Sequence, residues 1–189
     1  LMVDDAHGFG VLGGGRGSAW EFDPLPDIPL QMGTLSKAAG VYGAFLCASA
    51  PVIELMKNRA RSLIYTTGLP PAVIAACIAA VDIIGTDRDR VARPLENARA
   101  FCAAVGLPAP ESPIVPLVIG PEQAALDASA ALADSGFLVS PIRPPTVPAG
   151  TSRLRFTFTA EHTPAQVAAL VAAVNGLALP TADTRVAGT

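Results

Sequence analysis

Charged and aromatic residues are scarce in this chain of 189 residues. Asp, Glu, Lys and Arg supply 15% of it and Phe, Trp and Tyr 5%, whereas 51% is hydrophobic. This balance excludes an intrinsically disordered chain, in which high charge accompanies low hydrophobicity. A net charge of −3 and a pI near 5.3 leave no basic excess of the kind that binds nucleic acid or anionic lipid. We expect neither nucleic acid nor a membrane as a partner.

Long hydrophobic runs are also missing, although the mean hydropathy of +0.45 is high. Residues 70–84 are interrupted by Asp82, and residues 167–179 are interrupted by Asn175 and Gly176. Neither run reaches the roughly 18 unbroken apolar residues that a membrane-spanning helix needs. We therefore expect a soluble protein that has more apolar surface than its own core requires.

Cysteine and histidine are too few and too scattered for a disulfide framework or a metal site. Cys47, Cys77 and Cys102 form an odd set without C-x-x-C spacing, and only His7 and His162 accompany them. No metal site is therefore predicted. Unpaired cysteines are typical of a reducing compartment, which makes the cytoplasm the simplest expectation.

The pattern of apolar residues predicts an α/β protein with a boundary near residues 85–87. Before the boundary we expect strands and helices joined by a glycine-rich loop at residues 8–17: strands 1–3, 30–34 and 43–48, and helices 49–61 and 70–84. The helix at 70–84 is apolar almost all round and is predicted to be buried. Another helix, 87–105, leads into the second part and has a possible interruption at Pro94.

The second part reads as a compact β-α-β-β-α unit. The expected elements are strand 114–119, helix 121–135, strand 137–140, strand 154–159 and a helix ending at Gly176, followed by a frayed tail at 179–189. In the strand 154–159, apolar residues alternate with polar ones, which places Arg155 on the polar face. Thr163, Pro164 and Gln166 predict a capping box at the start of the last helix.

Residues 8–13 (GFGVLG) match the G-x-G-x-x-G pattern of dinucleotide-binding proteins. That function requires a helix to begin at these glycines, so that the helix N-terminus can meet the pyrophosphate. Here the chain continues with more glycines and then prolines, which do not allow a helix to begin. We therefore reject a nicotinamide site.

A second constellation is more informative. Asp4 and His7 follow a predicted strand, and Lys37 follows the next one among small residues. Each could be an ordinary polar loop residue at the edge of the sheet. Together, a lysine amine, an acid and nearby hydroxyls and glycines are the groups that proteins provide in pyridoxal-phosphate catalysis.

Five motifs in order along the chain resemble the α-oxoamine synthases, a family of pyridoxal-phosphate enzymes. They are LMVDDAHG (1–8), GRG (15–17), TLSK (34–37), IYTTGLPP (64–71) and IRPPTVPAGTSRLR (142–155). The resemblance implies the aspartate-aminotransferase-like α/β fold (fold type I). Residues 1–85 would be the C-terminal portion of the large cofactor-binding domain, and residues 86–189 the small α+β domain.

The resemblance also implies a role for each matching residue. Lys37 would form the Schiff base with pyridoxal 5'-phosphate and later remove the substrate Cα proton. Asp4 would pair with the pyridine nitrogen, and His7 would hydrogen-bond the ring phenolic oxygen. Thr34 would contact the phosphate, and so would Thr66 or Thr67 across a homodimer interface. Arg155 would bind the amino-acid carboxylate. Arg143 would bind an acyl-chain or product carboxylate.

The long last motif favours the family member that joins L-alanine to a pimeloyl thioester with loss of CO2. Two alternatives stay open: another α-oxoamine synthase, or a non-catalytic fragment that acts only in dimerisation or binding. The chain begins inside a predicted strand, and the N-terminal half of the family pattern is not in it. We therefore expect an incomplete fragment of the enzyme that is inactive in isolation.

Overall fold

The computed structural model describes residues 1–179, and its contacts divide the chain into two compact units, Leu1–Ala92 and Arg93–Thr189. The division falls inside a helix, a few residues after the boundary expected at 85–87. The frayed tail expected at 179–189 lies almost wholly outside the described residues. No helix within residues 1–179 has both the length and the apolar character needed to cross a membrane.

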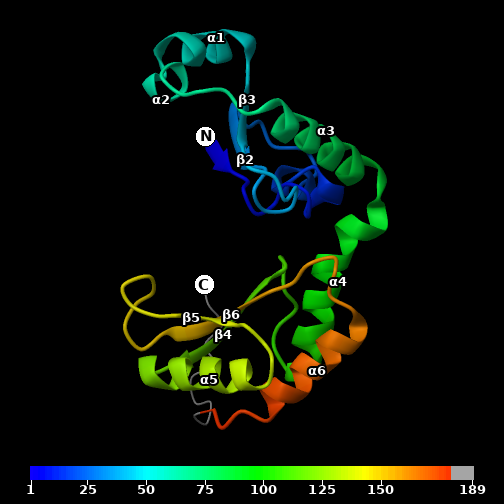
Figure 1. Ribbon diagram of the computed structural model, residues 1–189, viewed down its shortest axis with the longest axis vertical. Helices are drawn as coiled ribbons and strands as arrows, with labels where there is room; N and C mark the ends of the chain where they lie inside the picture. The colour runs from blue at the N-terminus through cyan, green and yellow to red at the C-terminus, as the bar shows by residue number, and fades with distance from the viewer. Residues whose placement is uncertain (180–189) are drawn as a thin grey trace. The chain divides into compact units, whose positions relative to one another are not determined.

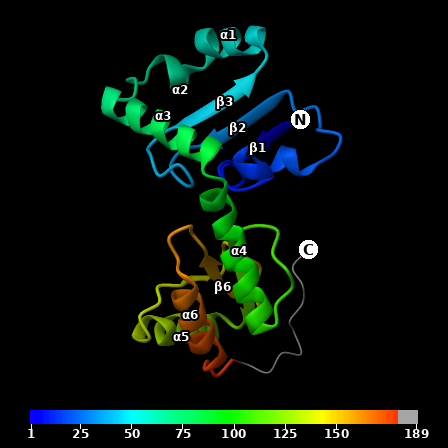
Figure 2. The same ribbon diagram turned by 90° about the vertical axis from the view of Figure 1, so that its right-hand side faces the viewer.

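The first unit is built on a three-stranded sheet in the order β1-β2-β3 (Figures 1 and 2). β1 (Met2–Asp4) runs parallel to β2 (Leu30–Thr34), and β3 (Ala44–Ala48) runs antiparallel to β2. The connection from β1 to β2 contains the short 3-10 turns η1 (Gly13–Gly15) and η2 (Ser18–Glu21). After β3 come the helices α1 (Ala50–Arg59), α2 (Arg61–Ile64) and α3 (Pro71–Thr86).

No α-helix begins at the glycine-rich connection, and this agrees with the prediction from the sequence. Gly13, Gly14 and Gly15 all have positive φ angles, a backbone conformation that glycine adopts without strain. They form only the single turn η1, so the helix N-terminus that a pyrophosphate needs is missing from this loop.

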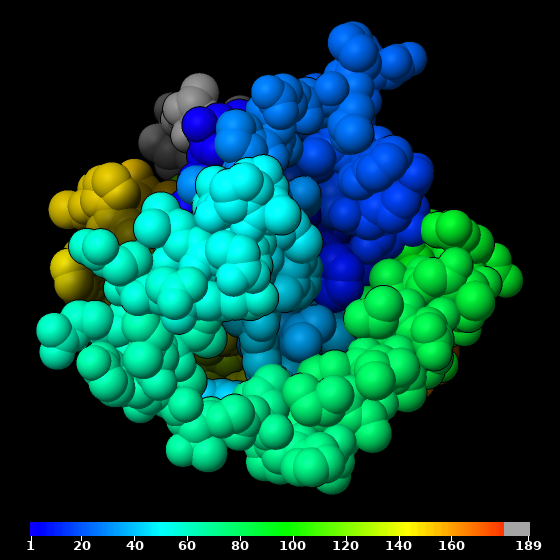
Figure 3. Space-filling model, turned by 90° about the horizontal axis from the view of Figure 1, so that it is seen from above, coloured from blue at the N-terminus to red at the C-terminus, as the bar shows by residue number. Residues whose placement is uncertain are grey.

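The expectation that the helix at 70–84 is buried is wrong. In α3 only Cys77 is buried, whereas Ile74, Ile78, Val81 and Ile83 are between 42% and 59% exposed. Figure 3 shows the segments from α1 to α3, coloured cyan to green, at the surface of the first unit. An apolar helix is buried all round only where other elements cover every side, and residues 1–179 cover one side of α3.

Two local expectations also need correction. The helix expected at 49–61 begins one residue later, since Ser49 precedes α1 and its side chain accepts no hydrogen bond from the helix N-terminus. Pro94 does not interrupt the next helix, because α4 runs without a break over Arg88–Val105. Pro94 itself is buried, so packing holds the helix together where the proline removes one backbone donor.

The second unit has the predicted β-α-β-β-α order (Figure 1). β4 (Ile114–Gly120), β6 (Ser152–Thr157) and β5 (Ser140–Ile142) form an antiparallel sheet with β6 in the centre. The helices are α5 (Glu122–Asp134) and α6 (Pro164–Asn175). The strand expected at 137–140 begins later, because the carbonyl of Val139 accepts a hydrogen bond from the Ser129 hydroxyl instead of joining the ladder.

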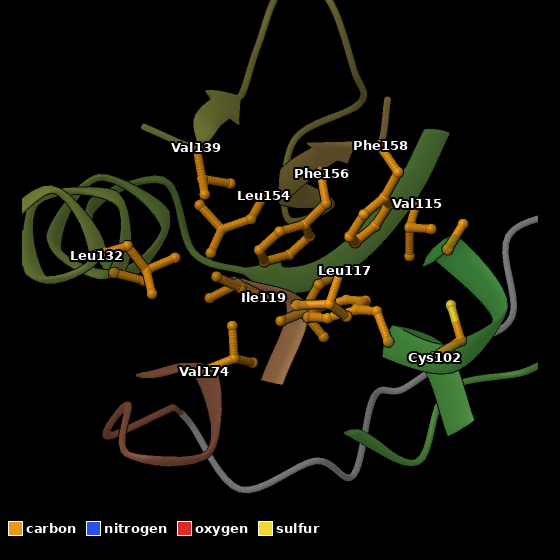
Figure 4. Close-up of a cluster of buried hydrophobic side chains, with 14 of the residues drawn as sticks. Cys102, Val115, Leu117, Ile119, Leu132, Val139, Leu154, Phe156, Phe158 and Val174 are labelled. Atoms are coloured by element: carbon orange, nitrogen blue, oxygen red, sulfur yellow. The ribbon is translucent and has the colours of Figure 1, made fainter. Parts of the chain in front are cut away.

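One hydrophobic core holds this unit together (Figure 4). Leu154, Phe156 and Phe158 point into it, as the alternation predicts, and the ring centroid of Phe156 lies 4.7 Å from that of Phe101 on α4. Cys102 lies in the same core, where burial raises the pKa of its thiol. This thiol therefore has a structural role in the core and is not a nucleophile.

The predicted capping box is confirmed. The Thr163 hydroxyl accepts a hydrogen bond from the Gln166 backbone N–H, and the Gln166 side chain accepts one from the Thr163 backbone N–H. Buried Asn97 on α4 donates to the carbonyls of Thr159 and His162 just ahead of this cap. These bonds fix the exit of β6, the strand that carries Arg155.

Candidate active site

The carboxyl ends of the parallel strands β1 and β2 bring four of the predicted site residues to one edge of the sheet. Asp4, the last residue of β1, is in register with Met32, and Thr34 ends β2 two residues later. His7 and Lys37 each follow three residues after these strand ends. The carboxyl edge of an α/β sheet is where such folds bind ligands.

Asp4 and Asp5 have opposite environments because consecutive residues of an extended chain point to opposite faces. Asp4 is exposed, and its Oδ1 accepts a 3.0 Å hydrogen bond from the Ala6 N–H. Asp5 is only 4% exposed. Exposed His7 stands in the turn after them, where the N–H groups of Gly8 and Phe9 donate to the Asp5 carbonyl at 3.1 and 3.0 Å.

Lys37 lies in the turn that joins β2 to β3. Its Nζ donates to Thr34 Oγ1 at 3.2 Å, so the amine and the hydroxyl already share one spot at the sheet edge. Both flanking residues, Ser36 and Ala38, are small and exposed, and Lys37 itself is exposed. The amine is therefore reachable from outside the first unit.

The glycine-rich loop packs directly against this turn. A Cβ added to Gly10 would lie 2.6 Å from the Cβ of Ala38, the neighbour of Lys37, and Gly10 has a φ of +78°. A side chain at position 10 would therefore push the Lys37 turn away from the sheet. Glycine here permits close approach to the lysine turn rather than to a nucleotide phosphate.

Thr66 and Thr67 are exposed on the segment between α2 and α3, and no contact within residues 1–179 joins them to Lys37. The same segment returns to the sheet at Leu69. A Cβ added to Gly43 would lie 3.3 Å from Leu69 Cδ1 and 3.3 Å from Leu35 Cδ1. The IYTTGLPP motif thus ends against the turn that contains Lys37, and the assignment of its threonines to a phosphate stays a prediction.

Arg155 lies in the second unit, on the face of the sheet opposite the helices. On β6 it is in register with Pro116 of β4 and Ser140 of β5, and its side chain is exposed. No carboxylate within residues 1–179 pairs with its guanidinium. Arg155 is thus available for an acidic ligand, as its place in the predicted alternation implies.

Arg143 follows β5 and is already engaged. Its Nη1 lies 2.8 Å from Glu122 Oε1 at the start of α5, with both side chains about half exposed (47% and 50%). An ion pair this exposed contributes little to stability, so a ligand carboxylate could displace Glu122 at small cost. The role predicted for Arg143 therefore requires an exchange of partners that Arg155 does not need.

Sequence reasoning missed Asp5, the most buried acid of this site. Its signal was present in the sequence as the second acid of a pair at a strand end, since alternation buries one member of such a pair. The structure offers no metal site nearby, because no cluster of three His, Cys, Asp or Glu side chains within residues 1–179 could hold an ion.

Comparison with known proteins places this chain in a family. Residues 1–174 match the aminotransferase class I and II family. The 8-amino-7-oxononanoate synthase of Methylocella silvestris is 62% identical over 177 residues, which cover 94% of this chain and 50% of that protein. The chain thus spans about half the length of the curated relatives it matches.

Two solved structures share the fold. The 8-amino-7-oxononanoate synthase of Francisella tularensis superimposes with a TM-score of 0.78 at 30% identity, covering 93% of this chain and 54% of its own. A serine palmitoyltransferase variant from S. paucimobilis, solved with a bound PLP-myriocin aldimine, gives 0.82 at 32% identity, covering 92% and 46%. The expected aspartate-aminotransferase-like α/β fold is confirmed. The chain belongs to the class I and II aminotransferase family.

Proposed function

We propose that this protein is a pyridoxal-phosphate-dependent acyltransferase that makes 8-amino-7-oxononanoate for biotin biosynthesis. L-alanine and pimeloyl-CoA, or a pimeloyl-carrier protein, are the substrates, and CO2 and the free thiol carrier leave. The observation that carries the proposal is that Asp4 and Thr34 end the parallel strands β1 and β2 at one edge of the sheet, with His7 and Lys37 in the turns that follow. The names of relatives that are 62% and 61% identical to this chain support the choice of this reaction.

The residues at this edge fit the cofactor chemically. Asp4 offers an exposed carboxylate for the pyridinium N–H, and His7 offers an imidazole for the phenolic oxygen. The Thr34 hydroxyl would donate to the phosphate, together with Thr66 or Thr67 from a partner subunit. When bound, pyridoxal phosphate supplies an electron sink for negative charge that develops at the substrate Cα.

Lys37 would have two roles at this edge of the sheet. Its Nζ is the amine that would bind the cofactor covalently until the amino group of alanine replaces it. In the structure this amine lies 3.2 Å from Thr34 Oγ1, and once free it would take the proton from the alanine Cα. Arg155 would hold the alanine carboxylate, and Arg143 would meet the pimeloyl or product carboxylate.

A second candidate is another α-oxoamine synthase, and the likeness to serine palmitoyltransferase supports it. Both candidates share the cofactor chemistry and differ in the amino acid and the acyl chain. A purely structural role in dimerisation or binding is the third alternative. All three are separated by substrate choice, because a binding module releases no thiol from any acyl donor.

The test is a substrate screen with the protein as its gene encodes it, loaded with pyridoxal phosphate. Release of free thiol from pimeloyl-CoA should depend on alanine and should be slower with glycine or serine. Palmitoyl-CoA should replace pimeloyl-CoA poorly. A preference for serine and palmitoyl-CoA would identify the second candidate, and no thiol release with any pair would refute an enzymatic role.

We further propose that residues 1–85 belong to the large cofactor-binding domain and residues 86–189 to the small domain of a cytoplasmic homodimer. Three free cysteines support the reducing compartment.

Exposed Ile64 and Tyr65, the latter 79% exposed, support an interface at residues 64–71. Sedimentation should show a dimer. On dilution the protein should lose cofactor and activity together, whereas an active monomer would refute the shared site.

A further inference from the structure

Asp5 is a buried carboxylate that the proposed chemistry does not use. Both of its carboxylate oxygens accept hydrogen bonds from the backbone N–H of Ser18, at 3.2 and 3.1 Å. Oδ2 also accepts a hydrogen bond from Gln31 Nε2 at 3.3 Å. No lysine or arginine within residues 1–179 forms an ion pair with it. Because a buried charge is costly without partners, these donors must stay in place around it.

The backbone on either side of Asp5 is shaped to admit these bonds. A Cβ added to Gly8 would lie 2.0 Å from Asp5 Oδ1, and one added to Gly17 would lie 1.9 Å from Oδ2. Glycine at both positions lets the two ends of the loop close on the carboxylate. Asp5 thus clamps the whole loop from residue 8 to residue 18 onto the end of β1.

The clamp reaches both halves of the proposed cofactor site. On one side, the Asp5 N–H donates to the Met32 carbonyl at 2.8 Å, and the Asp5 carbonyl accepts the N–H groups that close the turn around His7. On the other side, the clamped loop presses Gly10 against Ala38, next to Lys37. A displacement of Asp5 would therefore move the imidazole and the amine relative to each other.

We propose that Asp5 is a positioning residue that sets the geometry of His7 and Lys37 toward pyridoxal phosphate through the glycine-rich loop. This inference rests on the proposed function and goes beyond it, because Asp5 touches neither cofactor nor substrate. It differs from a purely structural role in one respect. A structural residue changes stability alone, whereas a positioning residue also changes how the bound cofactor titrates.

The test compares Asp5→Asn with Glu21→Gln in the cofactor-loaded protein as its gene encodes it. Glu21 is the matched control, because its carboxylate also holds this loop, at the Gly13 N–H, but lies outside the turn around His7. Asp5→Asn should weaken pyridoxal-phosphate binding about 5- to 10-fold. It should also shift the midpoint pH of the visible band of the bound cofactor by about half a unit or more. Glu21→Gln should lower the melting temperature and leave both cofactor readouts unchanged.

Two results would overturn the inference. If Asp5→Asn lowers only the melting temperature, as Glu21→Gln does, Asp5 is structural while the proposed function stands. If the parent protein binds no pyridoxal phosphate, the proposed function and the inference both fail. Gln31→Leu serves if Asp5→Asn does not fold, since it removes one donor and leaves the carboxylate in place. It should shift the same midpoint in the same direction by less, and an unchanged midpoint would contradict the role of Asp5.

Discussion

Lys37→Ala should reduce the rate of product formation by about 10²- to 10⁴-fold or more, the range expected when a positioned proton-transfer group is lost. Alanine leaves no amine at the sheet edge to bind the cofactor or to take the Cα proton. Thr34, whose Oγ1 accepts a 3.2 Å hydrogen bond from Lys37 Nζ, cannot replace the amine, because a hydroxyl is a far weaker base. The assay is thiol release from pimeloyl-CoA in the presence of alanine.

The same residue should carry the cofactor. Borohydride reduction of the loaded protein, followed by peptide mapping, should place the pyridoxyl group on Lys37. Lys57 is the only other lysine of the sequence, and it lies exposed on α1, 2.7 Å from Glu54. Lys57→Ala is therefore the matched control and should keep both the label and the activity. A label on Lys57 would show that the assignment of Lys37 is wrong.

Local sequence rules predicted much of the second unit. The alternation at 154–159 places Phe156 in the core and Arg155 outside it, because residues on one strand face opposite sides. The capping box at Thr163 forms as expected, since all of its partners lie within four residues of one another. Patterns of this kind depend on neighbours in the sequence, so they can be recognised without knowledge of the tertiary fold.

Features that depend on distant segments could not be predicted in the same way. Helix propensity and apolar content describe α3 correctly as a helix, but its burial depends on what covers each side. The clamp at Asp5 joins β1 to Ser18 and to Gln31 of β2, contacts that no sequence window contains. The motifs at residues 1–8 and 34–37 identified Asp4, His7, Thr34 and Lys37 as site candidates, and the parallel pairing of β1 with β2 explains why both motifs lie at the same edge of the sheet.

Arg155→Ala should weaken alanine binding about 10- to 150-fold, the loss expected for a charge-assisted hydrogen bond to a carboxylate. Arg155 is suited to this contact because its strand neighbours on the helix-free face are Pro116 and Ser140, which offer no competing charge. The stability of the second unit should change little, since the exposed guanidinium takes no part in its core. The measurement is a titration with alanine at saturating pyridoxal phosphate, in which the cofactor absorbance reports alanine binding.

Arg143→Ala separates the two carboxylate sites. Arg143 is paired with Glu122, which we expect the pimeloyl carboxylate to displace, so removal of Arg143 should raise the KM for pimeloyl-CoA and leave alanine affinity close to normal. Glu122→Gln is a second control, because it frees Arg143 without removing it and should not raise that KM. If Arg155→Ala instead raises the KM for pimeloyl-CoA while alanine still binds normally, the two arginines have exchanged roles. In that case the carboxylate of alanine would depend on the arginine that must first release Glu122.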